Sequence, residues 1–413
     1  MEGALRGRPA RQDRSVRTRE RLADAAVRVL GDKGLAGLTH RAVATAAGTS
    51  LATTTYYFAG RDDLLAEASQ ATLTAYTAAF ERVAERVGEG GDGIESLNVL
   101  IARLVAKACG THRTATLAWC EIILDAGRRE QTRDLARAWF EEAEAAWSVV
   151  ARRLGEADPV DAAKSAIDTV IGLIFIAGAC GVDATGARAV LEDGEDPLKL
   201  WRPAEAQASD GSEPRPRGPK AEATRERIVL AAIDLLIAHG AGVVGHRTVA
   251  ERAGLTTSAP AYYFRSIDDL LACAQKRLFE AAKTRYRQGL GGDRSPEATL
   301  MGLSDLTTVI FLREATEHAA ANIAGFSLWL EAARHPGLRP TVWAAVEDQS
   351  RAWAHLIAPL SKTENPLDGL MLQSFFLGKL VRAIATGADT TELAAIRGQF
   401  ARSLTSTTTG DLL

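Results

Sequence analysis

Basic, hydroxyl and aromatic side chains gather near the N-terminus in a pattern that suits binding to a polyanion. Residues 6–61 contain eleven Lys and Arg against four Asp and Glu, although the whole chain has a net charge of −3. Hydroxyl and aromatic residues follow each other in TSLATTTYYF, residues 49–58. Arginines and hydroxyls bond phosphates, and hydroxyls and methyl groups also contact base edges. The pattern favours nucleic-acid binding, with a solvated basic tail as the alternative.

The sequence lacks the signatures of an enzyme. We find no metal-ligand spacing, phosphate-cradling glycine loop, or Ser-His-Asp or Cys-His arrangement, so we expect no catalysis, metal or cofactor. Cys109, Cys120, Cys180 and Cys273 form no CxxC pair and are expected to be buried free thiols. The N-terminus has no signal-peptide pattern, and the most apolar segment, Val170 to Cys180, is too short to span a bilayer. These features predict a cytoplasmic protein without a membrane partner.

An internal repeat organises the chain. Residues 18–68 and 224–274 share 23 identities in 51 ungapped positions, at an offset of 206. The offset continues downstream, where it pairs Trp147 with Trp353 and Gly172 with Gly378. The repeated unit is therefore a whole domain of about two hundred residues.

The sequence of each repeat predicts helices throughout. Apolar residues recur at helical spacing from Leu22, and Gly34 and Gly240 are expected to stop the first helix of each copy. Thr39 and Ser50 are expected to cap two short helices that are joined by a tight turn at Gly48. This is the signature of a helix-turn-helix. The fold class that we predict is all-α, with two tandem units, each a helix-turn-helix domain plus a larger helical domain.

The segments THRAVATAAGTSLATTTYYFAGRDDLL and GHRTVAERAGLTTSAPAYYFRSIDDLL resemble the DNA-binding domain of the tetracycline-repressor (TetR) family. Both contain an alanine-glycine turn, a recognition helix that ends in aromatic residues, and an acidic-leucine start to the next helix. The resemblance implies a three-helix DNA-binding domain followed by a helical ligand-binding and dimerisation domain. Members of the family usually act as homodimers on operator DNA, and small molecules commonly release them.

The resemblance assigns DNA contacts by position. Ser50, Leu51, Thr53 and Thr54 are expected on the exposed start of the first recognition helix. Phe58 and Phe264 are expected in the core instead. The full set of expected contacts in the first copy is Thr39, Arg41, Ser50, Leu51, Thr53, Thr54, Tyr56, Tyr57 and Arg61, and in the second copy Arg247, Thr256, Thr257, Ser258, Tyr262, Tyr263 and Arg265.

The second copy departs from the first in ways that weaken its expected DNA binding. Gly245 replaces the capping Thr39, Ile267 replaces Arg61, and Pro260 enters the recognition helix. Ahead of the first copy, Arg6 and Arg8 belong to an RGRP motif that resembles an AT-hook. An extended arm of this kind places arginine in a narrow minor groove.

These observations predict six segments and a mode of action. Because the recognition helices differ, a fused chain that folds as an intramolecular pseudo-dimer should read an operator with unequal halves. Further dimerisation of chains is the alternative assembly. The segments are a basic arm at 1–16, DNA-binding domain 1 at 17–62, ligand domain 1 at 63–200, a linker at 201–222, DNA-binding domain 2 at 223–268 and ligand domain 2 at 269–405.

The function that we predict is a ligand-responsive transcriptional repressor, cytoplasmic and nucleoid-associated when bound to DNA. Its partners would be double-stranded operator DNA and a small-molecule effector that the sequence does not name. Aromatics such as Trp119, Trp147, Phe326, Trp329 and Trp353 suit an apolar pocket, although core packing explains most of them. Activation remains open, as does a binding module in which only the first helix-turn-helix reads DNA.

Overall fold

A computed structural model of the chain describes residues 8–88, 93–204, 218–289, 299–362, 365–387 and 390–409. Within these ranges the chain is helical and contains no strand, as the sequence predicts. The first unit consists of α1 (Arg8–Gly37), α2 (His40–Ala46), α3 (Leu51–Tyr57), α4 (Arg61–Gly88), α5 (Leu97–Cys109), α6 (Arg113–Arg128), α7 (Glu130–Arg153), α8 (Pro159–Cys180), α9 (Ala184–Leu191) and α10 (Pro197–Leu200).

The second unit repeats this order of helices. When 206 is added to the residue numbers of α6, the range of α17 is obtained. In the same way, Trp147 of α7 corresponds to Trp353 of α18. The helices are α12 (Pro219–His239), η1 (Ala241–Val243), α13 (His246–Ala253), α14 (Ala259–Tyr263), α15 (Ile267–Gly289), α16 (Leu300–Ala315), α17 (Ala319–Arg334), η2 (Pro336–Leu338), α18 (Arg339–Ile357), α19 (Asp368–Thr386) and α20 (Thr390–Thr409).

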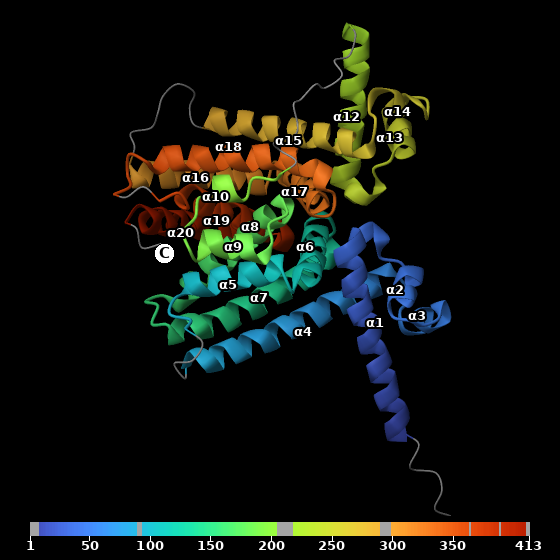
Figure 1. The fold of residues 1–413 in the computed structure, drawn as a ribbon, viewed down its shortest axis with the longest axis horizontal. Helices are drawn as coiled ribbons and strands as arrows, with labels where there is room; N and C mark the ends of the chain where they lie inside the picture. The colour runs from blue at the N-terminus through green and yellow to red at the C-terminus, as the bar shows by residue number, and fades with distance from the viewer. Residues whose placement is uncertain are drawn as a thin grey trace, which may run out of the picture.

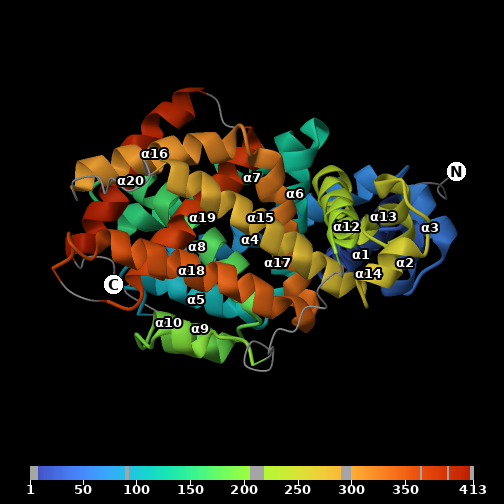
Figure 2. The ribbon, with the colours of Figure 1, turned by 90° about the horizontal axis from the view of Figure 1, so that it is seen from above.

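The two helix-turn-helix segments lie at the same end of the molecule. Helices α1 to α3 and α12 to α14 project from one end of a helical body, one above the other in Figure 1 and overlapping in Figure 2. In Figure 1, α4, α5 and α7 of the first unit lie on one side of the body, and α15, α16 and α18 of the second unit lie on the other. Helices α8 and α19 pack against each other between these two layers.

The packing of α8 against α19 is reciprocal. A Cβ added to Gly172 would lie 1.9 Å from the Ser374 carbonyl oxygen, and one added to Gly378 would lie 1.8 Å from the Asp168 carbonyl oxygen. The repeat offset relates Gly172 to Gly378 and Asp168 to Ser374. Each glycine therefore lets the backbone of the other unit approach at the equivalent place, which is the contact pattern of a two-fold interface.

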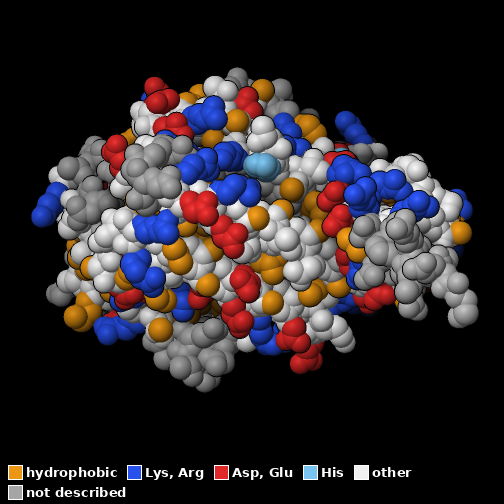
Figure 3. Space-filling model, turned by 90° about the horizontal axis from the view of Figure 1, so that it is seen from below, with side chains coloured by type: hydrophobic (Ala, Val, Ile, Leu, Met, Phe, Trp, Pro, Cys, Tyr) orange, Lys and Arg blue, Asp and Glu red, His pale blue; other side chains and the backbone are white. Residues whose placement is uncertain are grey.

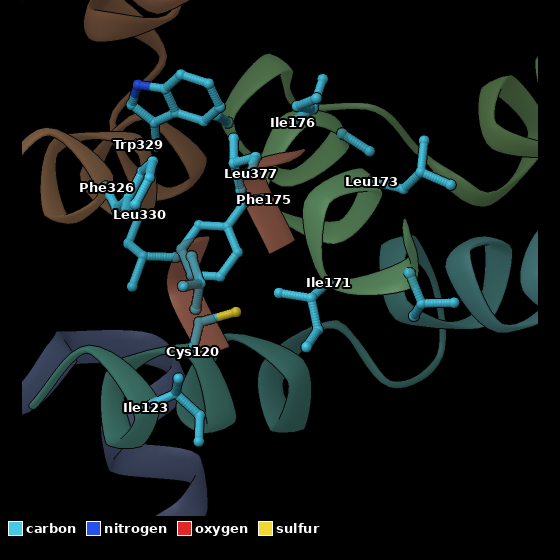
Figure 4. Close-up of a cluster of buried hydrophobic side chains, with 14 of the residues drawn as sticks. Cys120, Ile123, Ile171, Leu173, Phe175, Ile176, Phe326, Trp329, Leu330 and Leu377 are labelled. Carbon is cyan, nitrogen blue, oxygen red and sulfur yellow. The ribbon is translucent and has the colours of Figure 1, made fainter. Parts of the chain in front are cut away.

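The core continues across this interface. Phe175 of α8 and Phe326 of α17 have ring centroids 5.9 Å apart, and Figure 4 shows both rings facing one apolar cluster with Ile171, Leu330 and Cys120. Burial of such a cluster, at ~25 cal/mol per Å² of apolar surface, holds the two units together.

Helix α8 has the length and hydropathy of a membrane span. It contains 22 residues and includes the most apolar segment of the sequence, Val170 to Cys180. However, 78% of its most apolar window is buried inside the protein. Apolar surface on all sides of a helix is also the property of a core helix, and the packing against α19 accounts for it.

Two expected boundaries differ from the structure. Helix α1 begins at Arg8, so part of the expected arm at 1–16 is helical. The expected linker at 201–222 is shorter at both ends. Trp201 is buried and its Nε1 donates to the Gly186 carbonyl oxygen (2.9 Å), and α12 begins at Pro219.

Candidate nucleic-acid interface

Local capping sets the positions of α2 and α3. The Thr39 hydroxyl accepts a hydrogen bond from the Ala42 amide (3.2 Å), and the Ser50 hydroxyl accepts one from the Thr53 amide (3.1 Å). Gly34 has φ 65° and interrupts the helical backbone of α1. These three features confirm the expected helix boundaries. Each capping hydroxyl accepts with its oxygen, and the Ser50 hydroxyl also lies 2.9 Å from the Thr53 hydroxyl.

A small apolar core fixes the outward face of the first helix-turn-helix. Leu22, Leu30, Val43 and Phe58 are buried together, which confirms the expected core position of Phe58. Tyr56 is 81% exposed and Leu51 is 46% exposed on the opposite face of α3. The other expected contacts that are exposed in this copy are Thr39, Arg41, Ser50 and Arg61, while Thr53 and Tyr57 are half-buried.

Thr54 corrects the expected set. Its side chain is completely buried, and its hydroxyl donates to the Leu51 carbonyl oxygen (2.8 Å). The expectation that Thr54 is exposed is therefore wrong, because this face of α3 rests on α2. Pro260 takes the equivalent position in the second copy and is also buried. A proline is tolerated there because an amide in the first turn of a helix has no intrahelical partner.

A contact that the sequence analysis missed orients Tyr57. The Ser15 hydroxyl and the Tyr57 hydroxyl are 3.1 Å apart, which joins α1 to the end of α3. The rings of Tyr56 and Tyr57 meet edge to face with centroids 5.2 Å apart. Tyr262 and Tyr263 repeat this arrangement at 5.2 Å, and Tyr262 is 84% exposed.

The second helix-turn-helix begins its recognition helix later. Helix α14 starts at Ala259, so Thr256, Thr257 and Ser258 lie in the turn before it and are exposed. Arg247 and Arg265 are also exposed, and Phe264 is buried as expected. Ser258 makes no side-chain capping bond. We call the helix-turn-helix of α1 to α3 the first reader and that of α12 to α14 the second reader. The recognition helix of the second reader is therefore shorter than that of the first.

The missing cap at Gly245 is partly replaced. The Gly245 amide donates to the Thr248 hydroxyl (3.0 Å), and that hydroxyl donates to the Val243 carbonyl oxygen (2.7 Å). The sequence predicts the loss of the Thr39 cap at this position, whereas the bond from Gly245 to Thr248 is seen only in the structure. The start of α13 is thus held from its third residue instead of from its cap.

Basic side chains at this end of the molecule divide into paired and exposed groups. Arg19 pairs with Glu67 (2.6 Å) and Arg252 with Asp234 (2.8 Å), each within its own helix-turn-helix domain and the helix that follows it. Figure 3 shows Lys and Arg side chains gathered at the end of the molecule that carries the helix-turn-helix segments. Of the two expected arm residues, Arg6 lies outside the described residues. Arg8 is the first residue of α1, so the chain is helical there instead of extended.

An arginine of the second unit braces the first DNA-binding domain. Arg334, 9% exposed, donates to the Gly31 carbonyl oxygen (3.0 Å) and pairs with Glu121 (2.7 Å). Arg128, related to Arg334 by the repeat offset, lies against Gly240 of the second domain. Each ligand domain thus contacts the opposite reader. The repeat pairs these arginines in the sequence, but only the structure shows what they contact.

The cysteines and the titratable groups give no support for catalysis. Cys109, Cys120 and Cys180 are buried free thiols as expected, whereas Cys273 is half-buried. Burial raises the pKa of the Cys109 thiol to about 12, which disfavours the reactive thiolate. The described residues contain no cluster of His, Cys, Asp and Glu that could hold a metal ion.

Comparisons with known proteins agree with this architecture. The family model "Tetracyclin repressor-like, C-terminal domain" matches residues 92–194 and 298–406, and the model "Bacterial regulatory proteins, tetR family" matches residues 22–68. No curated protein matches the chain.

Solved structures resemble about half of the chain each. SCO7518 from Streptomyces coelicolor A3(2), assigned as a transcriptional regulator, is 24% identical, with 44% of this chain and 98% of that chain covered and a TM-score of 0.37. The multidrug binding protein EbrR, complexed with imidazole, is 22% identical (43% and 93% covered, TM-score 0.35). The fatty acid degradation regulator FadR from Bacillus halodurans is 14% identical (46% and 97% covered, TM-score 0.37). With the C-terminal model matched in both units, this chain belongs to the TetR family of DNA-binding helix-turn-helix transcriptional regulators.

Proposed function

We propose that the protein is a ligand-responsive repressor that acts as a single-chain pseudo-dimer, with both helix-turn-helix segments on one operator. The observation that carries the proposal is the reciprocal packing of α8 against α19. Helices at a two-fold interface normally join two identical chains. Here both helices belong to one chain, so one chain supplies both readers.

Buried charges at the same interface favour pairing of unlike units. Asp168, fully buried on α8, pairs with Lys379 (2.9 Å) and Arg382 (2.8 Å) on α19. Burial lowers the pKa of Lys379, and the Asp168 carboxylate opposes this shift. Arg382 also contacts Glu144 of the first unit. The acids thus come from the first unit and the bases from the second.

Pairs of identical units would leave these charges without partners. The repeat offset makes Leu173 the equivalent of Lys379 and Ile176 the equivalent of Arg382. It makes Ser374 the second-unit equivalent of Asp168. A pair of first units would bury Asp168 against apolar residues, and a pair of second units would bury the two bases against serine. An uncompensated buried charge costs about 3–5 kcal/mol, so the pairing of a first unit with a second unit is favoured over the pairing of identical units.

The two readers would contact DNA through different surfaces. In the first, we propose contacts from Thr39, Arg41, Ser50, Leu51, Thr53, Tyr56, Tyr57 and Arg61, and in the second from Arg247, Thr256, Thr257, Ser258, Tyr262, Tyr263 and Arg265. Half-sites about 34–36 Å apart suit two recognition helices in successive major grooves. Because the contact residues differ, we expect the two half-sites to differ in sequence.

Selection of random DNA by the purified full chain, at one fixed salt concentration, tests this proposal. The mass of the protein and of its complex is measured alongside. One 44.0 kDa chain on two unequal half-sites is the expected result. Two chains on a symmetric palindrome would overturn the single-chain pseudo-dimer.

A second candidate is a ligand-binding module in which only the first helix-turn-helix reads DNA. It is favoured by the shorter, uncapped α14 and by Ile267 at the position of Arg61. A single enriched half-site in the selection would support this candidate. We propose no catalytic activity for either form, and we place the protein in the cytoplasm, on the nucleoid when bound to DNA.

A further inference from the structure

A cavity of ≈ 180 Å³ lies inside the second unit. Its walls come from α15, α16, α17, α18 and α19, and they are mainly apolar and aromatic, with Phe279, Phe326 and Trp353 among them. An apolar cavity of about 150 Å³ is large enough for benzene. The space therefore suits a molecule with one or two small rings.

The same place in the first unit is filled. The repeat offset relates three cavity-lining residues, Ala282, Gly325 and Ala345, to Tyr76, Trp119 and Trp139. In the first unit the Trp139 ring lies 4.8 Å from that of Trp119 and 4.9 Å from that of Tyr76, measured between centroids.

The filled state is tightly packed. Trp119 and Trp139 are each 6% exposed, and Tyr76 contacts the indole nitrogen of buried Trp147. In the second unit, a Cβ added to Gly325 would meet no atom within 4 Å. Three large aromatic side chains thus occupy in one unit the volume that three of the smallest residues leave open in the other.

The polar groups around the cavity restrict what it can hold. Arg285 is neutralised by buried Glu314 through two contacts of 2.8 Å. Gln373 is satisfied by Gln349 and Ser350. The cavity wall therefore offers no free charge among these groups, and burying an unpaired charge there would be costly.

Gln275 is different from these satisfied groups. Its side chain is 5% exposed and lines the cavity, and its Oε1 atom is buried without a hydrogen-bond partner. A buried acceptor without a donor is unfavourable. A ligand that brings an N–H or O–H donor would satisfy it.

We propose that each chain binds one effector molecule, in the second unit alone, and that this effector is an uncharged, flat, apolar compound of one or two rings with an N–H or O–H donor for Gln275. The corresponding site of the first unit is closed by its own aromatic side chains. Binding itself does not require DNA. Its regulatory meaning rests on the proposed function.

The position of the cavity connects it to both readers. Helix α15, which carries Gln275, continues directly from the second helix-turn-helix. Helix α17 lines the cavity at Gly325 and ends at Arg334, which donates to Gly31 of the first reader. A ligand that shifts these two helices would therefore act on both halves of the DNA-binding end.

Calorimetric titration of the full chain with 5-fluoroindole, without DNA, tests the proposal. We expect one molecule per chain, with a Kd on the order of 0.1–1 mM for a probe of this size. Gln275→Leu should weaken binding by about threefold to tenfold, through loss of one neutral hydrogen bond.

Gly325→Trp copies the filled state of the first unit. It should abolish binding and raise the unfolding temperature, because it fills a void. Ala344→Trp is the matched control, since Ala344 is exposed one residue from Ala345 on the same helix, and it should bind the probe as the parent chain does. Two molecules per chain, no binding by the parent chain, or unchanged binding by folded Gly325→Trp would each overturn the proposal.

This test separates the two proposals. Loss of the cavity site would leave DNA selection by the two readers unaffected. Binding of the probe by a chain that selects no DNA would remove the repressor function and leave the cavity site standing.

Discussion

Replacing Asp168 by leucine should destabilise the protein strongly. Asp168 is fully buried and is the first-unit acid that pairs with Lys379, which is itself 7% exposed. Its loss would leave the Lys379 ammonium beside the neutral Gln399 side chain (2.6 Å) and the Phe375 ring (5.1 Å to the centroid). Breaking one side of a buried ion pair costs about 3–5 kcal/mol, so we expect a loss of this size in the free energy of unfolding.

Lys379→Met should cost less than Asp168→Leu. Arg382 still pairs with the Asp168 carboxylate in that variant (2.8 Å). The double variant removes both members of the Asp168–Lys379 pair and leaves Arg382 with Glu144, and apolar residues of similar volume can replace a buried ion pair at little cost. We therefore expect the double variant to be more stable than Asp168→Leu alone, with a coupling of about 1–3 kcal/mol.

Equilibrium unfolding in urea measures all three variants against the parent chain. Arg402→Gln is the control, because Arg402 is 59% exposed and its pair with Asp161 lies at the rim. A pair so exposed contributes about 0–1 kcal/mol. Strictly additive losses for Asp168→Leu and Lys379→Met, or an equal loss for the control, would refute the idea that this buried pair specifies the interface.

Four further substitutions test three other parts of the molecule. Arg334→Met removes the brace at Gly31, and we expect DNA affinity to fall by about fivefold or more while probe binding in the cavity is kept; equal losses of both would contradict a bracing role. The logarithm of the DNA association constant falls linearly with the logarithm of the salt concentration. Arg61→Gln should reduce the magnitude of this slope by about 1 if Arg61 neutralises one phosphate, and Ile267→Arg should increase it by a similar amount. Unchanged slopes would exclude both positions from the interface. Burial raises the pKa of Asp368 from 3.8 to about 6. Its folded pKa exceeds its unfolded value, so the stability that it contributes is complete below about pH 4 and is lost as the pH rises through 6. Asp368→Asn should therefore unfold at a higher temperature than the parent at pH 7 and at a similar temperature at pH 4; the same difference at both values would argue against titration of this group.

Local rules in the sequence predict the helix boundaries of the first reader well. Thr39, Ser50 and Gly34 act within one helical turn of their own positions, by capping or by a left-handed backbone. Such interactions depend on spacing along the chain and need no knowledge of the fold. The repeat offset likewise predicts the order of helices in the second unit.

Burial inside a short helix is harder to predict. Thr54 was expected on the exposed face of α3, and its burial depends on how α3 rotates against α2. A seven-residue helix carries too few apolar positions to define that rotation. The proline at the equivalent position in the second copy was the available signal, since it has no side-chain donor for DNA.

The cavity and the brace depend on residues that meet only after folding. Tyr76, Trp119 and Trp139 lie on three different helices, so their contrast with Ala282, Gly325 and Ala345 has no meaning until those helices converge. Arg334 and Gly31 are separated by 303 residues. The sequence favours a core role for most of the aromatics, with an apolar pocket as the alternative, and both hold in the second unit. Phe326 and Trp329 are buried in the core and also line the cavity.

The glycine contacts between α8 and α19 also bear on how the occupancy of a DNA site would depend on the concentration of this protein. Pairing within one chain persists at any dilution, because its effective concentration is set by the connecting segment and not by the number of molecules. A regulator assembled from two free chains occupies its site with the square of its concentration when dilute, whereas one that carries both halves responds in simple proportion. Halving the copy number would then halve the occupancy of a weakly bound site, where a dissociating dimer would lose three quarters.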